Sequence, residues 1–311
     1  MERRVIVSLG ILVVLAIAAG GYAQYYSTQQ KAPTELRIFV AASLTQAVKD
    51  HQQGFEKSNN VKILTNFGGS DQLYQQIYSG SPADVFMAAD SSWLVRLNQN
   101  GLLYNGKYWN FTTNILVVIL PPDNPKNIKS LIDLAQPGVK IAVAGFTVPV
   151  GRYTNITLTQ IDKTWGNSGN RNYKGPEWVN YRQRVIANVI TYETTVEQVV
   201  GKVLTGTVDA GFAYMSDATF LGQSKLKYVQ IPSDVNVQAA YGIGVVKGSS
   251  NYDLATKYVN FWVSQEGQVW LAKYGFGSTL PNITTSIGNT FFQLKTIKDE
   301  NARVFLTIER Q

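Results

Sequence analysis

Serine, threonine and small residues stand at four positions where a strand-like run gives way to a helix-like one. Ser43 follows an apolar run, Ser70 follows Gly68-Gly69, and Thr194-Thr195 precedes a helical pattern of valines. The fourth position is 149–151 (Pro-Val-Gly), where proline suits the first turn of a helix. Helix N-termini carry unpaired N–H groups and a partial positive charge, so several that converge can hold an anion without a formal cation. Each is also an ordinary helix start, and one alone would indicate nothing more.

Nucleophilic catalysis is poorly supported by the residue types present. The chain has no cysteine and a single histidine, His51, which any Ser-His-Asp arrangement would have to use. Ser43 and His51 would be separated by about 12 Å of rise on one helix, which is too far for proton transfer through a hydrogen bond. We therefore expect His51 to be a half-buried helix residue. An exported hydrolase that uses Ser43 or Ser70 is kept as the alternative from another class.

Metal and nucleic-acid sites are not indicated either. Without cysteine there is no disulfide, cysteine-ligated zinc, iron–sulfur cluster or lipidated cysteine. Asp84 and Asp90 each flank a turn, so structural capping is preferred over a catalytic carboxylate pair. Seventeen tyrosines allow a ferric site, but no cluster indicates one. The formal charge of +7 mildly favours anionic ligands, while basic runs never exceed two residues, so nucleic acid is not expected as a partner.

The elements that must position these residues alternate between strand-like and helix-like patterns, which is typical of parallel sheets covered by helices. Two apolar strand-like runs bracket a self-contained α/β block, so the chain is expected to cross to a second lobe and return. Strands are expected at 36–41, 61–67, 84–88, 115–120, 140–144, 189–192, 210–214 and 241–246. The expected units are 34–115 plus 240–285 as one lobe, 116–239 as the other, 163–184 as an inserted surface loop that leads into a helix, and 286–311 as a C-terminal extension of unassigned role.

The first 33 residues are interpreted as a signal or anchor segment and a tether. Arg3 and Arg4 precede an apolar stretch followed by small residues, which is typical of a secretory signal. From Val5 to Tyr26 the stretch is also long enough to span a bilayer as a helix. An uncleaved anchor, with the lobes held at the outer cell surface, is slightly favoured over cleavage that leaves a secreted or periplasmic protein.

Six segments, in order, resemble the molybdate-binding proteins of ABC importers, and together they cover about residues 35–281. The most specific is 79–90, Ser-Gly-Ser-Pro-Ala-Asp-Val-Phe-Met-Ala-Ala-Asp. The others are 38–48, 67–77, 148–153, 213–218 and 274–276. The resemblance implies an α/β, two-lobed type II periplasmic-binding-protein fold, in which each lobe is a mainly parallel sheet flanked by helices and the ligand occupies the cleft. It also implies a binding protein rather than an enzyme, with no cofactor.

The resemblance further implies a ligand shell and a partner. The hydroxyl and backbone N–H of Ser43 and Ser70 would hold ligand oxygens from one lobe. The backbone N–H of Val150 and of Val196 would do so from the other, and the hydroxyl of Tyr214 would complete the shell. The implied ligand is molybdate or tungstate, and the implied partner of this monomer is an ABC permease in the membrane.

Two acidic residues near this shell need an explanation. Asp71 follows Ser70, where a carboxylate would repel a dianion unless it points away. Glu193, close to the Val196 loop, is the one acid considered as a direct ligand of the metal atom. Apart from Glu193, no direct coordination of a metal by the protein is expected. A binding protein of the same fold for sulfate, phosphate or ferric ion is the alternative reading.

Overall fold

The structure is a computed structural model that describes residues 33–280, 285–287, 290–298 and 304–310. The predicted signal or anchor, centred on 5–26, lies outside these residues. No helix in the described part of the chain is both long and apolar enough to cross a bilayer.

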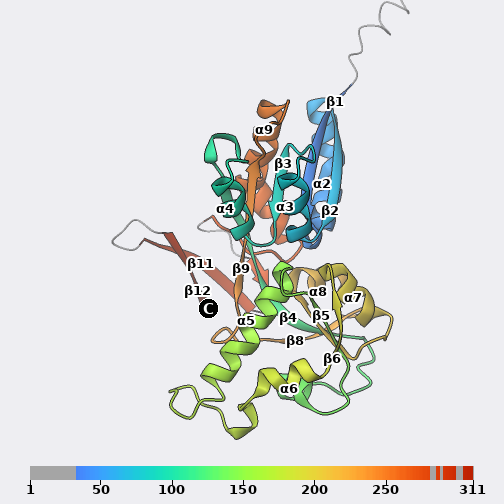
Figure 1. The fold of residues 1–311 in the computed structure, drawn as a ribbon, viewed down its shortest axis with the longest axis vertical. Coiled ribbons are helices and arrows are strands. Elements are labelled where there is room, and N and C mark those ends of the chain that lie inside the picture. Colours follow the sequence, from blue (N-terminus) through green and yellow to red (C-terminus); the bar gives the residue numbers. More distant parts are fainter. Residues whose placement is uncertain (1–32, 281–284, 288–289, 299–303, 311) are drawn as a thin grey trace, which may run out of the picture.

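Two α/β halves lie one above the other, joined by long strands (Figure 1). The strands are β1 (Thr34–Ala41), β2 (Val61–Gly68), β3 (Val85–Ala88), β4 (Trp109–Leu120), β5 (Ile141–Ala144), β6 (Val189–Glu193), β7 (Ala210–Tyr214), β8 (Lys227–Gln230) and β9 (Gln238–Val245). The α-helices are α2 (Thr45–Asn59), α3 (Ser70–Tyr78), α4 (Ser92–Gln99), α5 (Pro149–Thr164), α6 (Tyr181–Ala187), α7 (Val196–Leu204), α8 (Met215–Leu221), α9 (Tyr252–Val263) and α10 (Gln265–Ala272). The 3-10 turns are η1 (Ala42–Leu44), η2 (Tyr104–Gly106), η3 (Leu131–Ala135) and η4 (Pro176–Trp178).

Each half is built on parallel strands with antiparallel additions. In the first half β1 pairs with β2 and β3 in parallel, and β9 joins β3 antiparallel. In the second, β5 pairs in parallel with β6 and β7. The predicted α/β class and the two-lobed periplasmic-binding-protein fold are confirmed. The prediction missed only β8 among the strands up to β9.

Strand β4 passes from one half to the other. Its residues from Trp109 to Ile115 pair with β9, and its residues from Leu116 onward pair with β7 and β8. The strand predicted at 115–120 therefore begins earlier than expected, because Thr112, Thr113 and Asn114 interrupt the apolar pattern although all three are buried. Their polar groups are used inside the fold.

The carboxyl ends of the parallel strands in both halves face the gap between them. Strands β1, β2 and β3 end toward it from above, and β5, β6 and β7 end toward it from below (Figure 1). In open α/β sheets, ligands bind in the crevice at the carboxyl ends of the strands. The four helix starts chosen from the sequence follow β1, β2, β5 and β6.

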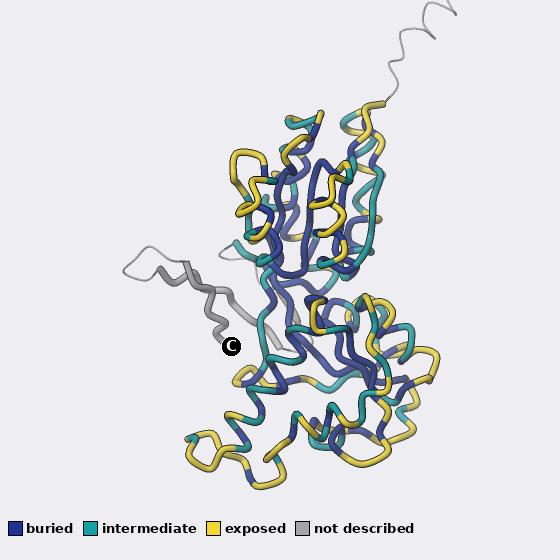
Figure 2. Tube along the Cα trace, viewed as in Figure 1, coloured by how far each residue is buried: buried dark blue, intermediate teal, exposed yellow. Residues whose placement is uncertain are grey.

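The core runs through both halves without interruption (Figure 2). Strand β4 from Leu116 to Leu120 is buried to 2% exposure or less, and so are Ile243 and Ala239 of β9. A second cluster, which includes Phe39, Leu73 and Trp93, packs α3 and α4 against the outer face of β1 and β3. This packing fixes the strand ends that carry the helix starts.

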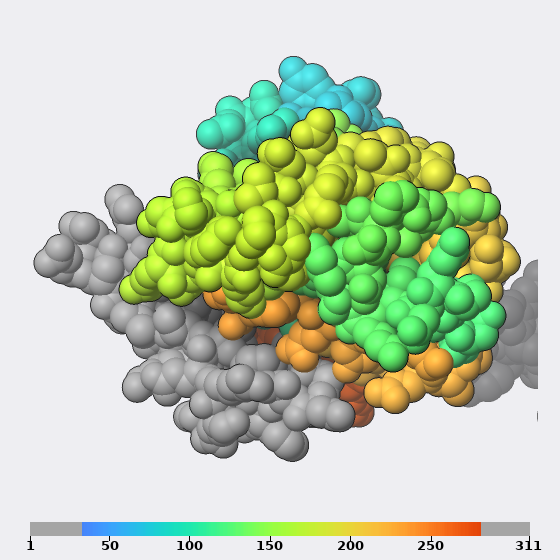
Figure 3. Space-filling view, turned by 90° about the horizontal axis from the view of Figure 1, so that it is seen from below, coloured from blue at the N-terminus to red at the C-terminus, as the bar shows by residue number. Residues whose placement is uncertain are grey.

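The predicted inserted loop at 163–184 begins inside α5, and the chain then runs over the lower half to α6. Seen from below, α5, α6 and their connection form much of this outer surface (Figure 3). Trp165 is buried and its indole N–H donates to Asp234 at 2.7 Å, so one end of the segment is held in the core.

Beyond the two halves, an antiparallel sheet forms from β10 (Thr285–Ile287), β11 (Thr290–Lys298) and β12 (Val304–Arg310). Most of this sheet belongs to the predicted C-terminal extension, for which no strand was expected.

Candidate functional site

A small cavity between the two halves brings together all five residues that the sequence singled out for ligand binding. Ser43, Ser70, Val150, Val196 and Tyr214 all line it. The other lining residues are Ala41, Ala42, Gly68, Gly69, Ala89, Val148, Pro149 and Thr195. No charged side chain of the described residues is in this lining, so any anion in the cavity would be held by neutral groups.

Ser43 sits in the 3-10 turn η1 between β1 and α2. Ser43 stands at the predicted helix start but does not cap α2: the residue before the helix is Leu44, because the chain makes an extra tight turn in which the Thr45 hydroxyl donates to the Ala42 carbonyl at 2.6 Å. The turn leaves the Ser43 hydroxyl directed away from the helix, 3.0 Å from the Tyr241 hydroxyl.

A chain of hydrogen bonds holds the Ser43 hydroxyl in place. The side-chain amide oxygen of Asn114 (Oδ1) accepts from the Ile115 backbone N–H at 3.0 Å. The side-chain amide nitrogen of Asn114 must therefore face inward. That nitrogen donates to the Tyr241 hydroxyl at 3.5 Å and to Ser216 at 2.8 Å. Either hydroxyl can donate in the Ser43–Tyr241 bond; where Tyr241 donates, the Ser43 hydrogen is left for the cavity. Sequence reasoning missed Asn114 and Tyr241; the available signal was an asparagine at the edge of an apolar strand run.

Ser70 opens α3 and is also prepared to donate. It is 1% exposed, and its hydroxyl oxygen accepts the Ala89 N–H at 3.0 Å. Because the Ser70 oxygen accepts that bond, the hydroxyl hydrogen is not used in it and can donate to a ligand. Since Ser70 is the first residue of α3, its backbone N–H also lacks a partner within the helix.

The second half contributes the first turns of α5 and α7. Helix α5 begins at Pro149 as predicted and has no side-chain cap, so the Val150 N–H has no partner within the helix. Gly151 is required next to it, because an added Cβ would collide with the Ala144 carbonyl oxygen. In α7 the cap is Thr195, whose hydroxyl accepts from Gln198 N–H at 3.4 Å. The Gln198 side-chain oxygen accepts from the Thr194 backbone N–H at 2.9 Å, and the Val196 N–H has no partner within the helix.

Tyr214 supplies a donor that nothing in the described protein uses. The residue is 1% exposed, and its hydroxyl has no hydrogen-bond partner. Burial raises the pKa of this hydroxyl well above its ordinary value, so it stays a neutral donor. A buried hydroxyl left unpaired costs about 1–3 kcal/mol, so its place in a cavity wall indicates a ligand that would accept from it.

Contacts between the two halves close the cavity. Arg152 of α5 forms an ion pair with Asp90, which follows β3. Asp71, which raised concern as a charge beside the site, accepts from the Thr147 hydroxyl of the opposite half at 2.9 Å and does not line the cavity. Gly69 comes so close to the opposite half that an added Cβ would lie 2.8 Å from the Thr194 carbonyl oxygen.

The residues set aside during sequence analysis lie elsewhere. His51 is half-buried in α2 as expected, stacked on Phe261 with ring centroids 3.7 Å apart, and burial lowers its pKa to about 4. Asp84 accepts from the backbone N–H of Arg37 at 2.6 Å, a structural role. Glu193 accepts from the Thr191 hydroxyl at 2.7 Å and does not line the cavity. The described residues contain no group of three or more histidine and acidic side chains arranged for a metal.

Comparison with known proteins gives consistent matches over most of the chain. The profile of a family described as bacterial extracellular solute-binding protein matches residues 36–277. Molybdate-binding protein ModA of Mycobacterium tuberculosis (strain H37Rv) is 32% identical over 240 residues, which are 77% of this chain and 83% of that protein. The substrate-binding domain of a putative molybdenum ABC transporter from Clostridium difficile superposes with a TM-score of 0.58 at 29% identity, covering 79% of this chain and all of that one. The sulfate-binding protein SubI of M. tuberculosis superposes with a TM-score of 0.66 at 19% identity, covering 80% and 88% of the two chains.

Proposed function

Because the chain belongs to the bacterial extracellular solute-binding protein family, we propose that it captures a tetrahedral oxyanion, molybdate or tungstate, in the cavity between its lobes and delivers it to an ABC importer. The observation that carries the proposal is the unpaired, buried Tyr214 hydroxyl, in the same cavity wall as the free donors of Ser43 and Ser70. Each such N–H or O–H bond to an anion is charge-assisted, so neutral donors suffice.

The size of the cavity restricts the ligand to a single small ion. Its volume is about 20 Å³, equivalent to a sphere of about 1.7 Å radius. The oxygens of a bound anion, which are about as large as water, must place their centres within such a space. One tetrahedral oxyanion meets this condition, whereas an organic acid of several carbons does not.

Lobe closure provides the binding mechanism, and no chemical step on the ligand is involved. We propose that residues 34–115 with 240–285 form one lobe and 116–239 the other, as the change of partners along β4 at Ile115 supports. Closing the lobes places the donors of α5 and α7 opposite Ser43 and Ser70, and the Arg152–Asp90 pair and the Asp71–Thr147 bond hold that state. The closed form is the one offered to the permease.

Thermal melting of the chain with a panel of anions tests the ligand. Binding at a thousandfold excess over Kd stabilises by about 4 kcal/mol. We expect molybdate and tungstate to raise the melting temperature and equimolar sulfate and phosphate to raise it much less. A smaller anion cannot reach every donor, and each donor left unpaired costs about 1–3 kcal/mol. An equal shift with sulfate would favour the second candidate, a sulfate-binding protein, which the likeness to SubI in fold keeps open.

Removal of single hydroxyls tests the assigned roles. Ser43→Ala and Ser70→Ala should each weaken molybdate binding by about 1.5–3 kcal/mol, the range for a hydrogen bond to a charged group. His51→Ala is the control and should leave the affinity unchanged. Isothermal titration calorimetry measures the molybdate affinity of all three variants. A separate assay tests the hydrolase alternative, which would be supported if the protein hydrolysed an ester or phosphoester and His51→Ala abolished that activity.

Attachment to the cell is a separate proposal. The chain has no cysteine to carry a lipid, so we propose that residues 5–26 anchor it in the membrane and that the lobes lie outside, near the permease. The native protein should then fractionate with membranes and begin at or near Met1. A terminal sequence that begins at Gln24 or later, with protein free in the medium, would show a cleaved signal instead.

A further inference from the structure

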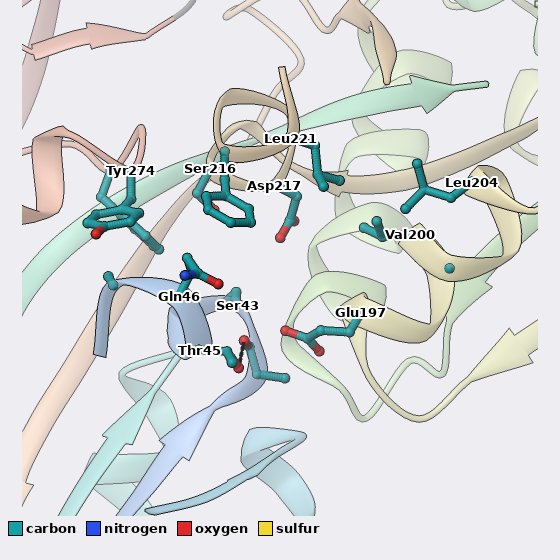
Figure 4. A pocket seen from close by; sticks show the side chains of 15 residues that line it. Ser43, Thr45, Gln46, Glu197, Val200, Leu204, Ser216, Asp217, Leu221 and Tyr274 are labelled. Carbon is teal, nitrogen blue, oxygen red and sulfur yellow. Dashed lines mark hydrogen bonds between the residues drawn. The ribbon is translucent and has the colours of Figure 1, made fainter. Parts of the chain in front are cut away.

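A second and larger pocket adjoins the oxyanion cavity on the other side of Ser43. Its volume is about 240 Å³, and Ala42 and Ser43 line both spaces. The walls come from both lobes: the start of α2 and the segment after α10 on one side, α7 and α8 on the other (Figure 4). Because the lining is shared between lobes, the pocket is complete only while the lobes are together.

Two carboxyl groups point into this pocket from neighbouring helices. Glu197 enters from the first turn of α7 and Asp217 from the first turn of α8, and both are directed toward the open centre (Figure 4). One oxygen of Asp217 accepts from the Tyr214 backbone N–H at 2.9 Å. No lysine, arginine or histidine of the described residues lines the pocket, so these acids have no cationic partner there.

The rest of the lining is mainly apolar. It includes aliphatic groups of α7, namely Val200 and Leu204, and the rings of Phe220, Tyr274 and Phe276. Phe220 is 50% exposed and Leu204 is 41% exposed, so the apolar rim is open to a ligand. The pocket also has the polar side chains of Ser43, Thr45, Gln46 and Ser216, but the described residues bring no group of three acidic or histidine side chains together, so a metal ion is not favoured. An ammonium head on a short hydrocarbon chain matches both parts, since aromatic faces also attract cations.

We propose that this pocket is a second ligand site that binds a small primary alkylammonium ion, with its charged head between Glu197 and Asp217 and its hydrocarbon part against α7, Phe220 and Phe276. The cation site itself does not depend on the identity of the oxyanion. Its coupling to the neighbouring cavity, described next, rests on the proposed function.

The position of the pocket makes the two sites cooperative. A ligand that contacts both lobes favours the closed form, in which the oxyanion donors are assembled. A cation beside Ser43 also attracts the dianion on the other side of that residue. By linkage, each ligand must then raise the affinity for the other by the same factor, for which about fivefold is the low end of typical values.

The protonation of the two acids gives the site a pH dependence with a known sign. Desolvation by the pocket walls raises the pKa of Glu197 to about 7, although its side chain is open at the mouth. Desolvation and the nearby Glu197 raise the pKa of Asp217 to about 8. The other groups that face them are neutral apart from Asp50, which accepts from the Tyr274 hydroxyl at 2.7 Å. An alkylammonium keeps its charge at these pH values, like lysine with a pKa of about 10.4. Its binding should therefore strengthen as pH rises from 6 to 9.

Calorimetric titration of the full chain with n-butylammonium chloride tests the site, with n-butanol as the neutral analogue. We expect saturable binding of the ammonium ion, at least tenfold weaker binding of butanol, and a tenfold or greater loss in Glu197→Gln and in Asp217→Asn. The amide oxygen that the second substitution introduces can still accept from the Tyr214 backbone N–H. Glu266→Gln is the matched control, because Glu266 holds the same place in the first turn of α10 as Glu197 does in α7.

The results separate this proposal from the function proposed above. Butylammonium binding that tightens with pH and is lost in the two pocket variants supports the site, even if molybdate fails to bind. Equal binding of butanol, affinity independent of pH, or an equal loss in Glu266→Gln would overturn it. If molybdate binds but its affinity is unchanged by saturating butylammonium, the cooperative part is wrong.

Discussion

Replacing Tyr214 by phenylalanine should change stability and binding in opposite directions. The variant keeps the buried ring and removes only the hydroxyl, which has no partner in the ligand-free protein. An unpaired buried hydroxyl costs about 1–3 kcal/mol, so the ligand-free variant should be as stable as the parent or more stable. If that hydroxyl donates to a bound oxyanion, its removal should weaken binding by about 1.5–3 kcal/mol, or roughly 10- to 150-fold.

Melting curves with and without molybdate show both effects. At a concentration that stabilises the parent by about 4 kcal/mol, the variant should gain only about 1–3 kcal/mol. At about 2–4 °C per kcal/mol for a chain near this size, the difference is easily resolved. Tyr258→Phe is the control, since Tyr258 is equally buried but lies in α9, away from the cavity. An affinity of Tyr214→Phe within twofold of the parent would refute the role of the hydroxyl.

Two further substitutions probe closure and pH. Gly69→Ala places a Cβ 2.8 Å from the Thr194 carbonyl oxygen. The substitution should therefore hold the lobes apart and reduce oxyanion affinity at least tenfold, while the ligand-free fold is kept. An unchanged affinity in calorimetry would show that closure tolerates the methyl group. His51 has a pKa lowered by burial to about 4, so its contribution to the free energy of unfolding is present above pH 6.5 and is lost as pH falls toward 4. Urea unfolding at several pH values should show this slope, and His51→Leu should reduce it; an unchanged slope would assign it to other groups.

Most of the fold was predictable from local patterns. Apolar runs of four to eight residues located every strand of the two lobes except β8, whose sequence Lys-Tyr-Val-Gln is short and half exposed. Pro149 and the valines of α7 marked helix starts correctly, because these signals act within a single turn. Strands β10 to β12 were missed, because no pattern in the C-terminal extension indicated what they pair with.

The site was predictable in its members but not in its geometry. The helix starts at Ser43, Ser70, 149–151 and Thr194-Thr195 were visible in the sequence, while the ligand roles of Val150, Val196 and Tyr214 came from the family resemblance; all five proposed ligand residues line one cavity, and the ligand shell stays a prediction. The hydrogen-bond chain from Asn114 through Tyr241 spans 127 sequence positions, so no local signal joins the two.

The pocket beside the site was missed for a similar reason. Glu197 and Asp217 read locally as acids in the first turns of two separate helices. Only the fold brings the starts of α7 and α8 to the same pocket, where the two acids have the shared role proposed above.

Strand β4 has a consequence for how the protein unfolds. It is one unbroken strand that completes both sheets, and its buried residues belong to a core that continues through β9. Neither lobe can lose its order without exposing the half of β4 that the other lobe also needs. The two lobes should therefore melt as one cooperative unit, with equal calorimetric and van't Hoff enthalpies, even though the proposed capture of a ligand requires them to move relative to each other. The strand that joins the two lobes is thus also the element that makes the fold all-or-none.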